Sequence, residues 1–216
     1  MVPDGITAIE GRWEWRRVRE SIVTKNKISA PSPKSAKLIP VSLALAAAAL
    51  FLSGCAALDR GPVGNRNVPQ PAKAVELERY LGRWYEYGRY EAGFQKGCEA
   101  VTAEYARLPD GGVSVLNSCR KDAVDGKLST AKGKAKIVEG SGGAKLKVSF
   151  FGPFYGDYWV LDHAEDYSWS IVGEPSGRYL WMLTRTPKPS EPTAALLKAR
   201  VQELGYDWSL VRMTKH

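Results

Sequence analysis

The feature that most constrains the fold of this chain is a series of short segments in which apolar and polar residues alternate. In residues 132–137 lysine occupies every second position, and in residues 145–150 lysine alternates with Leu, Val and Phe. A period of two is typical of strands with one buried face. About eight such segments follow one another at roughly ten-residue spacing, which predicts an antiparallel meander. The predicted strands are 84–90, 100–107, 113–119, 132–137, 145–150, 155–162, 167–173 and 178–186.

The connections agree with this pattern. Pro109-Asp110-Gly111-Gly112 predicts a turn, because proline fixes φ and glycine permits positive φ. Residues 76–81 predict a single helical turn, and residues 208–213 predict a short last strand.

One longer helix is predicted after the strands. Ser190 can cap it, Pro192 lies in its first turn and Gly205 can end it. Its apolar stripe is formed by Leu196, Leu197, Val201 and Leu204. Eight strands and one late helix fit either a sandwich or a closed barrel. A barrel of eight strands has no free edges and has room inside for one small ligand.

The first 54 residues predict a signal peptide. The apolar run 41–52 is too short to span a bilayer as a helix, and the basic residues Lys34 and Lys37 precede it. Leu52-Ser53-Gly54-Cys55 resembles the bacterial lipobox, which predicts cleavage before Cys55 and lipid modification of its thiol. The alternative is an ordinary cleaved signal followed by a chance cysteine. Ala56, rather than Asp, after the cysteine favours the outer membrane.

The signal would normally lie at the extreme N-terminus, so we expect that the start is placed too early, with Val23 as a possible true start. A long basic region before the signal is the alternative. Residues 55–75 hold Gly, Pro and Asn without periodicity and predict a lipidated N-terminus with a flexible tether. The folded domain is predicted to be 76–216.

The charge argues against a nucleic-acid partner. The formal net charge of the whole chain is +8. Residues 1–54 contribute +4, and the remaining 162 residues carry only another +4. A dedicated nucleic-acid binder would concentrate its basic residues on one face. With two histidines and three cysteines, the chain also has little material for a metal site, and we expect neither a metal nor a cofactor.

Three segments together resemble the lipocalin family. Gly82-Arg83-Trp84 matches the Gly-x-Trp signature at the start of the first strand. Residues 148–158 and 179–187 are similar to later strands of bacterial outer-membrane lipocalins, and the second includes the signature Arg185. The middle signature is partly present as Asp166-Tyr167 without its threonine. The resemblance implies an all-β, eight-stranded antiparallel up-and-down barrel, with one C-terminal helix packed outside.

The resemblance also implies residue roles at one end of the barrel. Trp84 would plug the closed end, Arg185 would pack across its ring, and Gly82 would let the chain turn tightly into the barrel. A cation–π contact of this kind contributes roughly 0.5–2 kcal/mol.

Cys98 and Cys119 are expected to form a disulfide. They lie on two strands joined by the 109–112 turn, and pairing of residue 104 with 113 extends roughly to 98 with 119. An exported compartment is oxidising. The alternative is two free thiols in the core.

The favoured function is a lipid-binding protein anchored in the outer membrane, facing the periplasm or another part of the envelope. The resemblance implies fatty acids or lysophospholipids as ligands, with storage, transport or envelope maintenance as the role; a homodimer is possible. The predicted pocket residues are Val101, Ala103, Tyr105, Val148, Phe150, Tyr158 and Trp181.

Two other functions stay open. An enzyme acting on lipids or isoprenoids inside the barrel would need titratable groups aimed at the cavity, and its candidates are Glu86, Glu104 and His163. No Gly-x-Ser-x-Gly elbow is present, which argues against a serine hydrolase. A structural envelope protein with a filled barrel would have a cavity smaller than a lipid tail.

Overall fold

The alternating segments form antiparallel strands in the computed structural model, which describes residues 62–216. The signal segment and Cys55 lie outside the described residues. The strands are β1 (Gly82–Tyr90), β2 (Cys98–Arg107), β3 (Val113–Lys121), β4 (Leu128–Ile137), β5 (Lys145–Phe151), β6 (Phe154–His163), β7 (Trp169–Gly173), β8 (Leu180–Thr184) and β9 (Val211–Met213). The helices are α3 (Leu77–Tyr80) and α4 (Glu191–Glu203), with single 3₁₀ turns η1 (Gly93–Gln95) and η2 (Trp208–Leu210).

Strand β1 closes the sheet into a barrel. Each strand from β2 to β7 pairs with the strand that follows it in the sequence, and β1 pairs with both β8 and β2. The first half of β1 pairs with β2, where Gly82 is opposite Tyr105, and its second half pairs with β9, where Gly88 is opposite Met213. The barrel of eight antiparallel strands is therefore confirmed, and the sandwich is excluded. The short β9 pairs with the second half of β1, which β2 does not reach.

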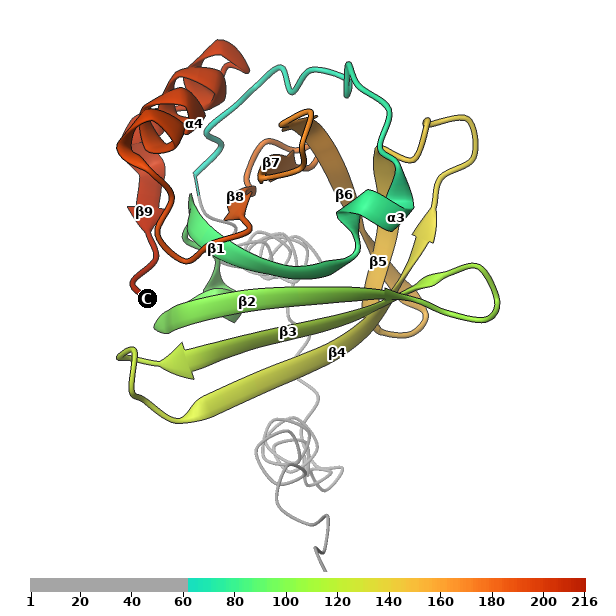
Figure 1. The fold of residues 1–216 in the computed structure, drawn as a ribbon, viewed down its shortest axis with the longest axis horizontal. Helices are drawn as coiled ribbons and strands as arrows, with labels where there is room; N and C mark the ends of the chain where they lie inside the picture. The colour runs from blue at the N-terminus through green and yellow to red at the C-terminus, as the bar shows by residue number, and fades with distance from the viewer. Residues whose placement is uncertain (1–61) are drawn as a thin grey trace, which may run out of the picture. The chain divides into compact units, whose positions relative to one another are not determined.

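The antiparallel order gives the barrel two distinct ends. The β2–β3, β4–β5 and β6–β7 connections share one end, which we call the closed end because α3 lies across it (Figure 1). The β1–β2, β3–β4, β5–β6 and β7–β8 connections share the other, which we call the open end.

Helix α4 packs against the outer wall of the barrel. Leu197 and Val201, one turn apart, are fully buried against Ile171, Leu180 and Met182 of β7 and β8. Ser190 caps the helix by accepting a hydrogen bond from the Thr193 amide at 3.4 Å. The predicted apolar stripe is too wide, because Leu196 is 44% exposed. No helix within residues 62–216 is long and apolar enough to cross a membrane.

The register of β2 and β3 differs from the expected one. Residue 104 is opposite Leu116, not residue 113, and Arg107 is opposite Val113. The strands run almost to the turn, where the Leu108 amide donates to the Gly112 carbonyl at 2.8 Å. A bulge between Glu99 and Thr102 then shifts the register again toward the open end.

The segment before α3 is not a flexible tether throughout. The amides of Gly64 and Asn65 donate to the Gly177 carbonyl in the β7–β8 connection, at 3.0 and 3.2 Å. Asn65 is only 5% exposed, and its side-chain amide donates to the Leu204 carbonyl at 2.8 Å. Near the closed end, the Val75 amide donates to the Gly142 carbonyl at 2.8 Å. The packed chain therefore starts well before the predicted boundary at residue 76, and it runs along the barrel from the open end to the closed end (Figure 1).

Candidate functional site

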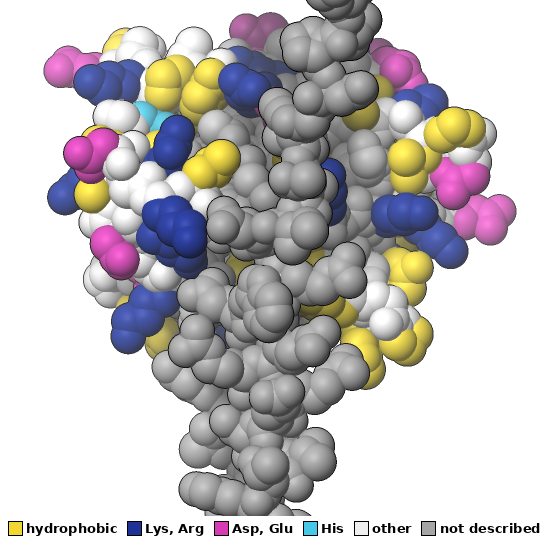
Figure 2. Space-filling model, turned by 90° about the horizontal axis from the view of Figure 1, so that it is seen from below, with side chains coloured by type: hydrophobic (Ala, Val, Ile, Leu, Met, Phe, Trp, Pro, Cys, Tyr) yellow, Lys and Arg dark blue, Asp and Glu magenta, His cyan; other side chains and the backbone are white. Residues whose placement is uncertain are grey.

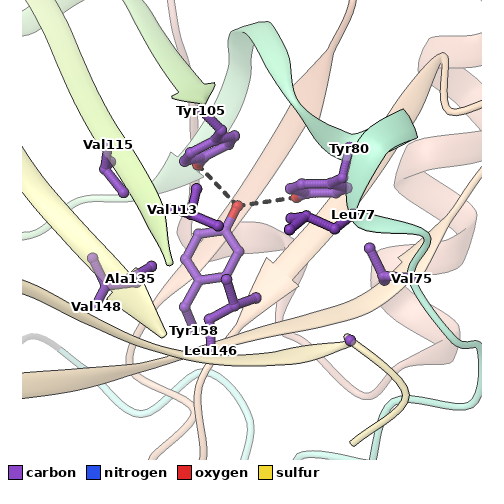
Figure 3. A pocket seen from close by; sticks show the side chains of 11 residues that line it. Val75, Leu77, Tyr80, Tyr105, Val113, Val115, Ala135, Leu146, Val148 and Tyr158 are labelled. Carbon is purple, nitrogen blue, oxygen red and sulfur yellow. Dashed lines mark hydrogen bonds between the residues drawn. The ribbon is translucent and has the colours of Figure 1, made fainter. Parts of the chain in front are cut away.

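An apolar cavity lies inside the closed half of the barrel (Figure 3). Alternation along β3, β4 and β5 turns every second side chain inward, and the segment leading into α3 covers the cavity from the closed end. Its lining residues are Val75, Leu77, Tyr80, Tyr105, Val113, Val115, Ala135, Gly143, Leu146, Val148 and Tyr158.

Three tyrosine hydroxyls supply the polar groups of this cavity. The Tyr158 hydroxyl lies 3.0 Å from the hydroxyls of both Tyr80 and Tyr105 (Figure 3). The Tyr80 hydroxyl continues the chain to Ser170 Oγ, also at 3.0 Å. The cavity thus combines apolar walls with a single hydrogen-bonded row of hydroxyls.

These hydroxyls are neutral at physiological pH. Burial raises the pKa of Tyr80 to about 12, against which its hydrogen bonds to Ser170 and Tyr158 act only partly. Burial likewise raises the pKa values of Tyr105 and Tyr158. The tyrosines offer a ligand hydrogen bonds but no charge.

The cavity is small in this state of the protein. It measures about 20 Å³, roughly the room that one water molecule needs. A hydrocarbon chain can enter this cavity only if the side chains that line it move.

Three of the seven predicted pocket residues line the cavity, namely Tyr105, Val148 and Tyr158. Phe150 lies against Gly133 on the same face of β5 as Val148, one step nearer the open end. Trp181 donates from its indole to the Gln95 side-chain oxygen at 3.0 Å.

The remaining two predicted pocket residues have other neighbours. Ala103 is opposite the buried Trp84, and Val101 packs with Cys98 and Cys119. A role in ligand binding stays a prediction for all seven predicted pocket residues.

Most of the residues that line the cavity were not predicted from the sequence, for two reasons. Val113, Val115, Ala135 and Leu146 follow the same period of two as the residues that were chosen, so the alternation could have found them. Val75, Leu77 and Tyr80 reach the cavity only because the N-terminal segment folds over the closed end, and no local pattern indicates this.

The contact between Trp84 and Arg185 helps to hold the closed end. Trp84 is fully buried, and its indole donates to the Tyr80 carbonyl at 2.8 Å. The Arg185 guanidinium lies 3.7 Å from the centroid of the Trp84 ring. It also donates to the carbonyls of Arg83 and Arg79 at 2.8 and 2.7 Å. Gly82 has a φ of +87°, which favours glycine at this turn into β1.

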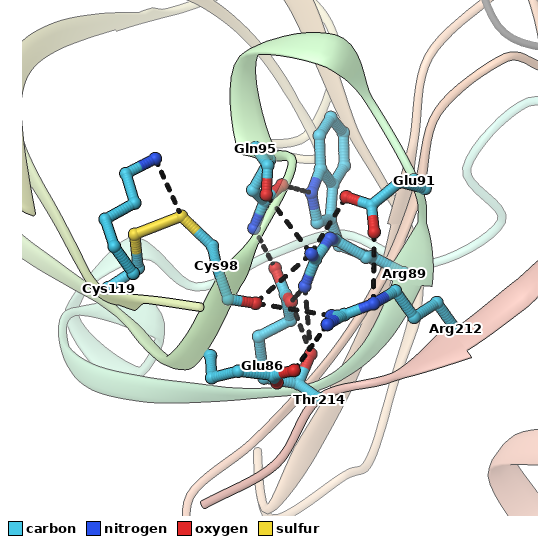
Figure 4. Close-up of a disulfide and its surroundings, with 11 residues drawn as sticks. Glu86, Arg89, Glu91, Gln95, Cys98, Cys119, Arg212 and Thr214 are labelled. Atoms are coloured by element: carbon cyan, nitrogen blue, oxygen red, sulfur yellow. Dashed lines mark hydrogen bonds and ion pairs between the residues drawn. A yellow bond between two sulfur atoms is a disulfide. The ribbon is translucent and has the colours of Figure 1, made fainter. Parts of the chain in front are cut away.

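A disulfide joins Cys98 and Cys119, with their Cα atoms 5.4 Å apart (Figure 4). The predicted bridge is confirmed, although the ladder places Cys98 opposite Lys121. The bulge in β2 brings the sulfur atoms together despite the shifted register. The bond ties the start of β2 to the end of β3 at the open end of the barrel.

Buried charges occupy the interior next to this disulfide. Arg89 is fully buried and donates to Glu86 at 2.7 Å, and to the Cys98 carbonyl at 3.2 Å (Figure 4). Gln95 of η1 bonds to Glu86 and accepts from Trp181, so it links the β1–β2 connection to the barrel interior. Removing one partner of such a buried ion pair costs far more free energy than the intact pair contributes. The pair therefore constrains the conformation of this part of the barrel wall.

The three candidates for catalysis are engaged separately. Glu86 is paired with Arg89, and Glu104 is paired with Arg83 on the barrel exterior. The His163 ring nitrogens lie 2.8 and 3.0 Å from the carbonyl oxygens of Ala164 and Ala74. Their arrangement aims no acid–base pair at the cavity. Among residues 62–216, no group of three His, Cys, Asp or Glu side chains is placed to hold a metal ion.

Comparison with known proteins agrees with this geometry. A family model for the lipocalin-like domain matches residues 75–216. The outer membrane lipoprotein Blc of Vibrio cholerae is 42% identical over 160 residues, covering 74% of this chain and 93% of that protein. The Escherichia coli K12 protein of the same name is 35% identical, covering 80% of this chain and 94% of that one.

A plant relative and a solved structure also match the chain. Temperature-induced lipocalin-1 of Arabidopsis thaliana is 39% identical over 66% of this chain and 80% of that protein. The solved structure of insecticyanin from the tobacco hornworm Manduca sexta superimposes with a TM-score of 0.54 at 18% identity, covering 72% of this chain and 85% of that one. At that identity the likeness shows the fold alone.

Proposed function

The chain belongs to the lipocalin-like family, and we propose that its barrel binds the acyl chain of a fatty acid or lysophospholipid. The observation that carries the proposal is the apolar cavity in the closed half of the barrel, whose polar groups are neutral hydroxyls. Burying methylene groups in such a place is favourable by at most about 0.8 kcal/mol each. An uncharged lining favours a hydrocarbon tail over a charged head group.

The ligand would lie along the barrel axis, with its tail in the closed half and its head group at the open end. Because Trp84, Arg185 and α3 cover the closed end, the tail would arrive from the open end. On that route it would pass Phe150, which lies one step nearer the open end than the cavity residue Val148. We propose that Phe150 and neighbouring interior side chains move when a tail enters, since the cavity at rest has room for about one water molecule.

We further propose that the protein is an outer-membrane lipoprotein and not an enzyme. The support is the lipobox-like Leu52–Cys55 sequence together with relatives that are themselves named outer membrane lipoproteins. The separate engagement of Glu86, Glu104 and His163 supports binding over catalysis. A role in envelope maintenance, and a homodimer, remain parts of this proposal.

A purely structural barrel is the second candidate, and the small cavity favours it. The two functions separate in a calorimetric titration of the purified protein with fatty acids and lysophospholipids of about eight to eighteen carbons. Lipid binding predicts that affinity rises with chain length until the tail outgrows the site, by at most about 0.8 kcal/mol per methylene, and depends weakly on salt. A flat series would favour the structural barrel.

A matched pair of variants tests the position of the tail. Phe150→Arg places a charge on the inner face of β5, and we expect it to abolish binding. Ser149→Arg adds the same charge on the outer face of the same strand and should leave the affinity unchanged. Equal affinities in the two variants would contradict the proposed route.

A further inference from the structure

We propose that the open end of the barrel docks against the bilayer that holds the lipid anchor, with an aromatic rim immersed in the membrane interface. This inference rests on the proposed function in one respect, the lipidation of Cys55. It goes beyond it by assigning an interaction surface, a partner and an orientation.

Exposed apolar side chains are concentrated at the open end. Nine large apolar side chains are exposed in residues 62–216, and six of them lie at or next to the open-end connections. Phe94, Phe151 and Phe154 are 70%, 67% and 77% exposed. The other three are Val124, Leu128 and Tyr155, and we call these six residues the rim. At the closed end only Ile137, the last residue of β4, belongs to the exposed set.

The rim residues come from three different connections. Phe94 belongs to η1, Val124 and Leu128 flank the β3–β4 turn, and Phe151 is opposite Phe154 across the β5–β6 turn. Phe94 also packs on Tyr179 of the β7–β8 connection, with ring centroids 5.8 Å apart. Exposed apolar side chains that gather at one end of a molecule point to a contact with a partner or a membrane, and aromatic rings are favoured at the membrane interface.

The path of the chain selects the membrane as the partner. The Gly64 amide is bonded to Gly177 in the β7–β8 connection, so the chain reaches the barrel at the open end, beside Tyr179. Cys55 precedes Gly64 by nine positions in the sequence. A chain of that length spans at most roughly 30 Å. A ten-residue strand is itself about 33 Å long, so a lipid anchor on Cys55 would bring the open end to the bilayer more readily than the closed end.

The exposed lysines of β4 do not single out one end of the barrel as a docking surface. Lys132, Lys134 and Lys136 are exposed along β4, from near the open end to near the closed end. In the parts of Figure 2 where described residues are visible, Lys and Arg side chains lie among apolar and acidic ones. Docking by the apolar rim therefore predicts a weak dependence on salt and on anionic lipid.

The test uses the lipidated full chain in vesicles of phosphatidylethanolamine and phosphatidylglycerol, with a nitroxide attached to one introduced cysteine. Val124→Cys reports on the open end, and Ile137→Cys is the matched control at the closed end. The native Cys98 and Cys119 are joined in the disulfide and do not compete for the label. We expect collisions with a water-soluble nickel chelate to fall several-fold at position 124 on anchoring, and to stay unchanged at position 137.

A second variant tests whether the rim aromatics cause the docking. Replacing Phe94, Phe151 and Phe154 with Ser in the Val124→Cys background should restore water accessibility at position 124 while the protein still floats with the vesicles. Equal water accessibility of both labels in floating protein would overturn the docking inference and leave the anchor intact. Protein that fails to float would overturn the anchor and with it the docking. The ligand titration is independent of both results.

Discussion

The closed and open ends of this barrel use aromatic side chains in opposite ways. At the closed end Trp84 is fully buried under the Arg185 guanidinium and hydrogen bonded to the Tyr80 carbonyl. At the open end Phe94, Phe151 and Phe154 are mostly exposed. Aromatic rings thus stabilise the fold at one end, whereas at the other most of their surface is exposed. Sequence composition alone cannot distinguish the two uses, since both depend on which connection a residue occupies.

The difference between the two ends predicts its largest effect for the free energy of unfolding. Trp84→Ala removes a fully buried ring and should lower the free energy of unfolding by about 3–5 kcal/mol. Phe154→Ala removes an exposed ring and should change it by no more than about 0.5 kcal/mol. Urea denaturation of the two variants measures both values. Similar losses would mean that the open-end aromatics also belong to the core.

The disulfide should give the next largest effect, and its consequences should be local. Replacing both Cys98 and Cys119 with Ser should lower the free energy of unfolding by roughly 3 kcal/mol. Because the bond ties β2 to β3 at the open end, amide hydrogen exchange should accelerate there first, while amides around Trp84 stay protected. Uniform acceleration along the barrel would contradict a difference between the two ends. The oxidised wild-type protein should also resist alkylation until a reductant is added.

The smallest expected effect concerns acid stability where the start of β2 contacts β9 and the residue Lys215 that follows it. Burial raises the pKa of Glu99, but the hydrogen bond from the Lys215 amide and the nearby Arg212 guanidinium lower it by more, so the pKa lies below its ordinary value. Its stabilisation is present above the pKa of the unfolded chain, and it is lost as the pH falls through the lower pKa of the folded state.

Glu99→Gln should therefore destabilise the protein at pH 7 and converge with the wild type in acid. Glu104→Gln, on the barrel exterior, is the control and should show a smaller difference at pH 7. Denaturation midpoints between about pH 2 and 7, roughly the range over which carboxylates titrate, measure the difference. A wild-type advantage that persists undiminished at the acid limit would contradict the assignment to Glu99.

The fold could be predicted from the sequence because its signals are local. Alternating lysines on β4 and β5, the Pro109–Gly112 turn and the Ser190 cap each act within a few residues, and the family resemblance supplied closure of the barrel. The register of β2 and β3 was not predicted correctly, because the ladder continues to Arg107 and Val113 beside the turn, and a bulge after Glu99 then shifts it again. Leu196 was assigned to the buried face of α4 for a similar reason, since periodicity cannot give the width of a contact.

The site was predictable only in part. Tyr105, Val148 and Tyr158 follow from alternation along single strands. Val75, Leu77 and Tyr80 enter the cavity because residues 64–80 cross the barrel and cover its end, which is a long-range arrangement without a local pattern. Polar residues such as Asn65, whose amide bonds to the Leu204 carbonyl, made this segment resemble a tether.

The most direct test of the account is to locate the two ends of a bound acyl chain. Two fatty acids, one with a diazirine at the terminal carbon and one with a diazirine beside the carboxyl group, would be photolysed with the protein and the adducts mapped by mass spectrometry. The account predicts terminal-carbon adducts on cavity residues such as Val113, Leu146 and Tyr158, and carboxyl-side adducts on the open-end connections. Adducts of both probes on the outer surface, or a reversed order along the barrel, would contradict it.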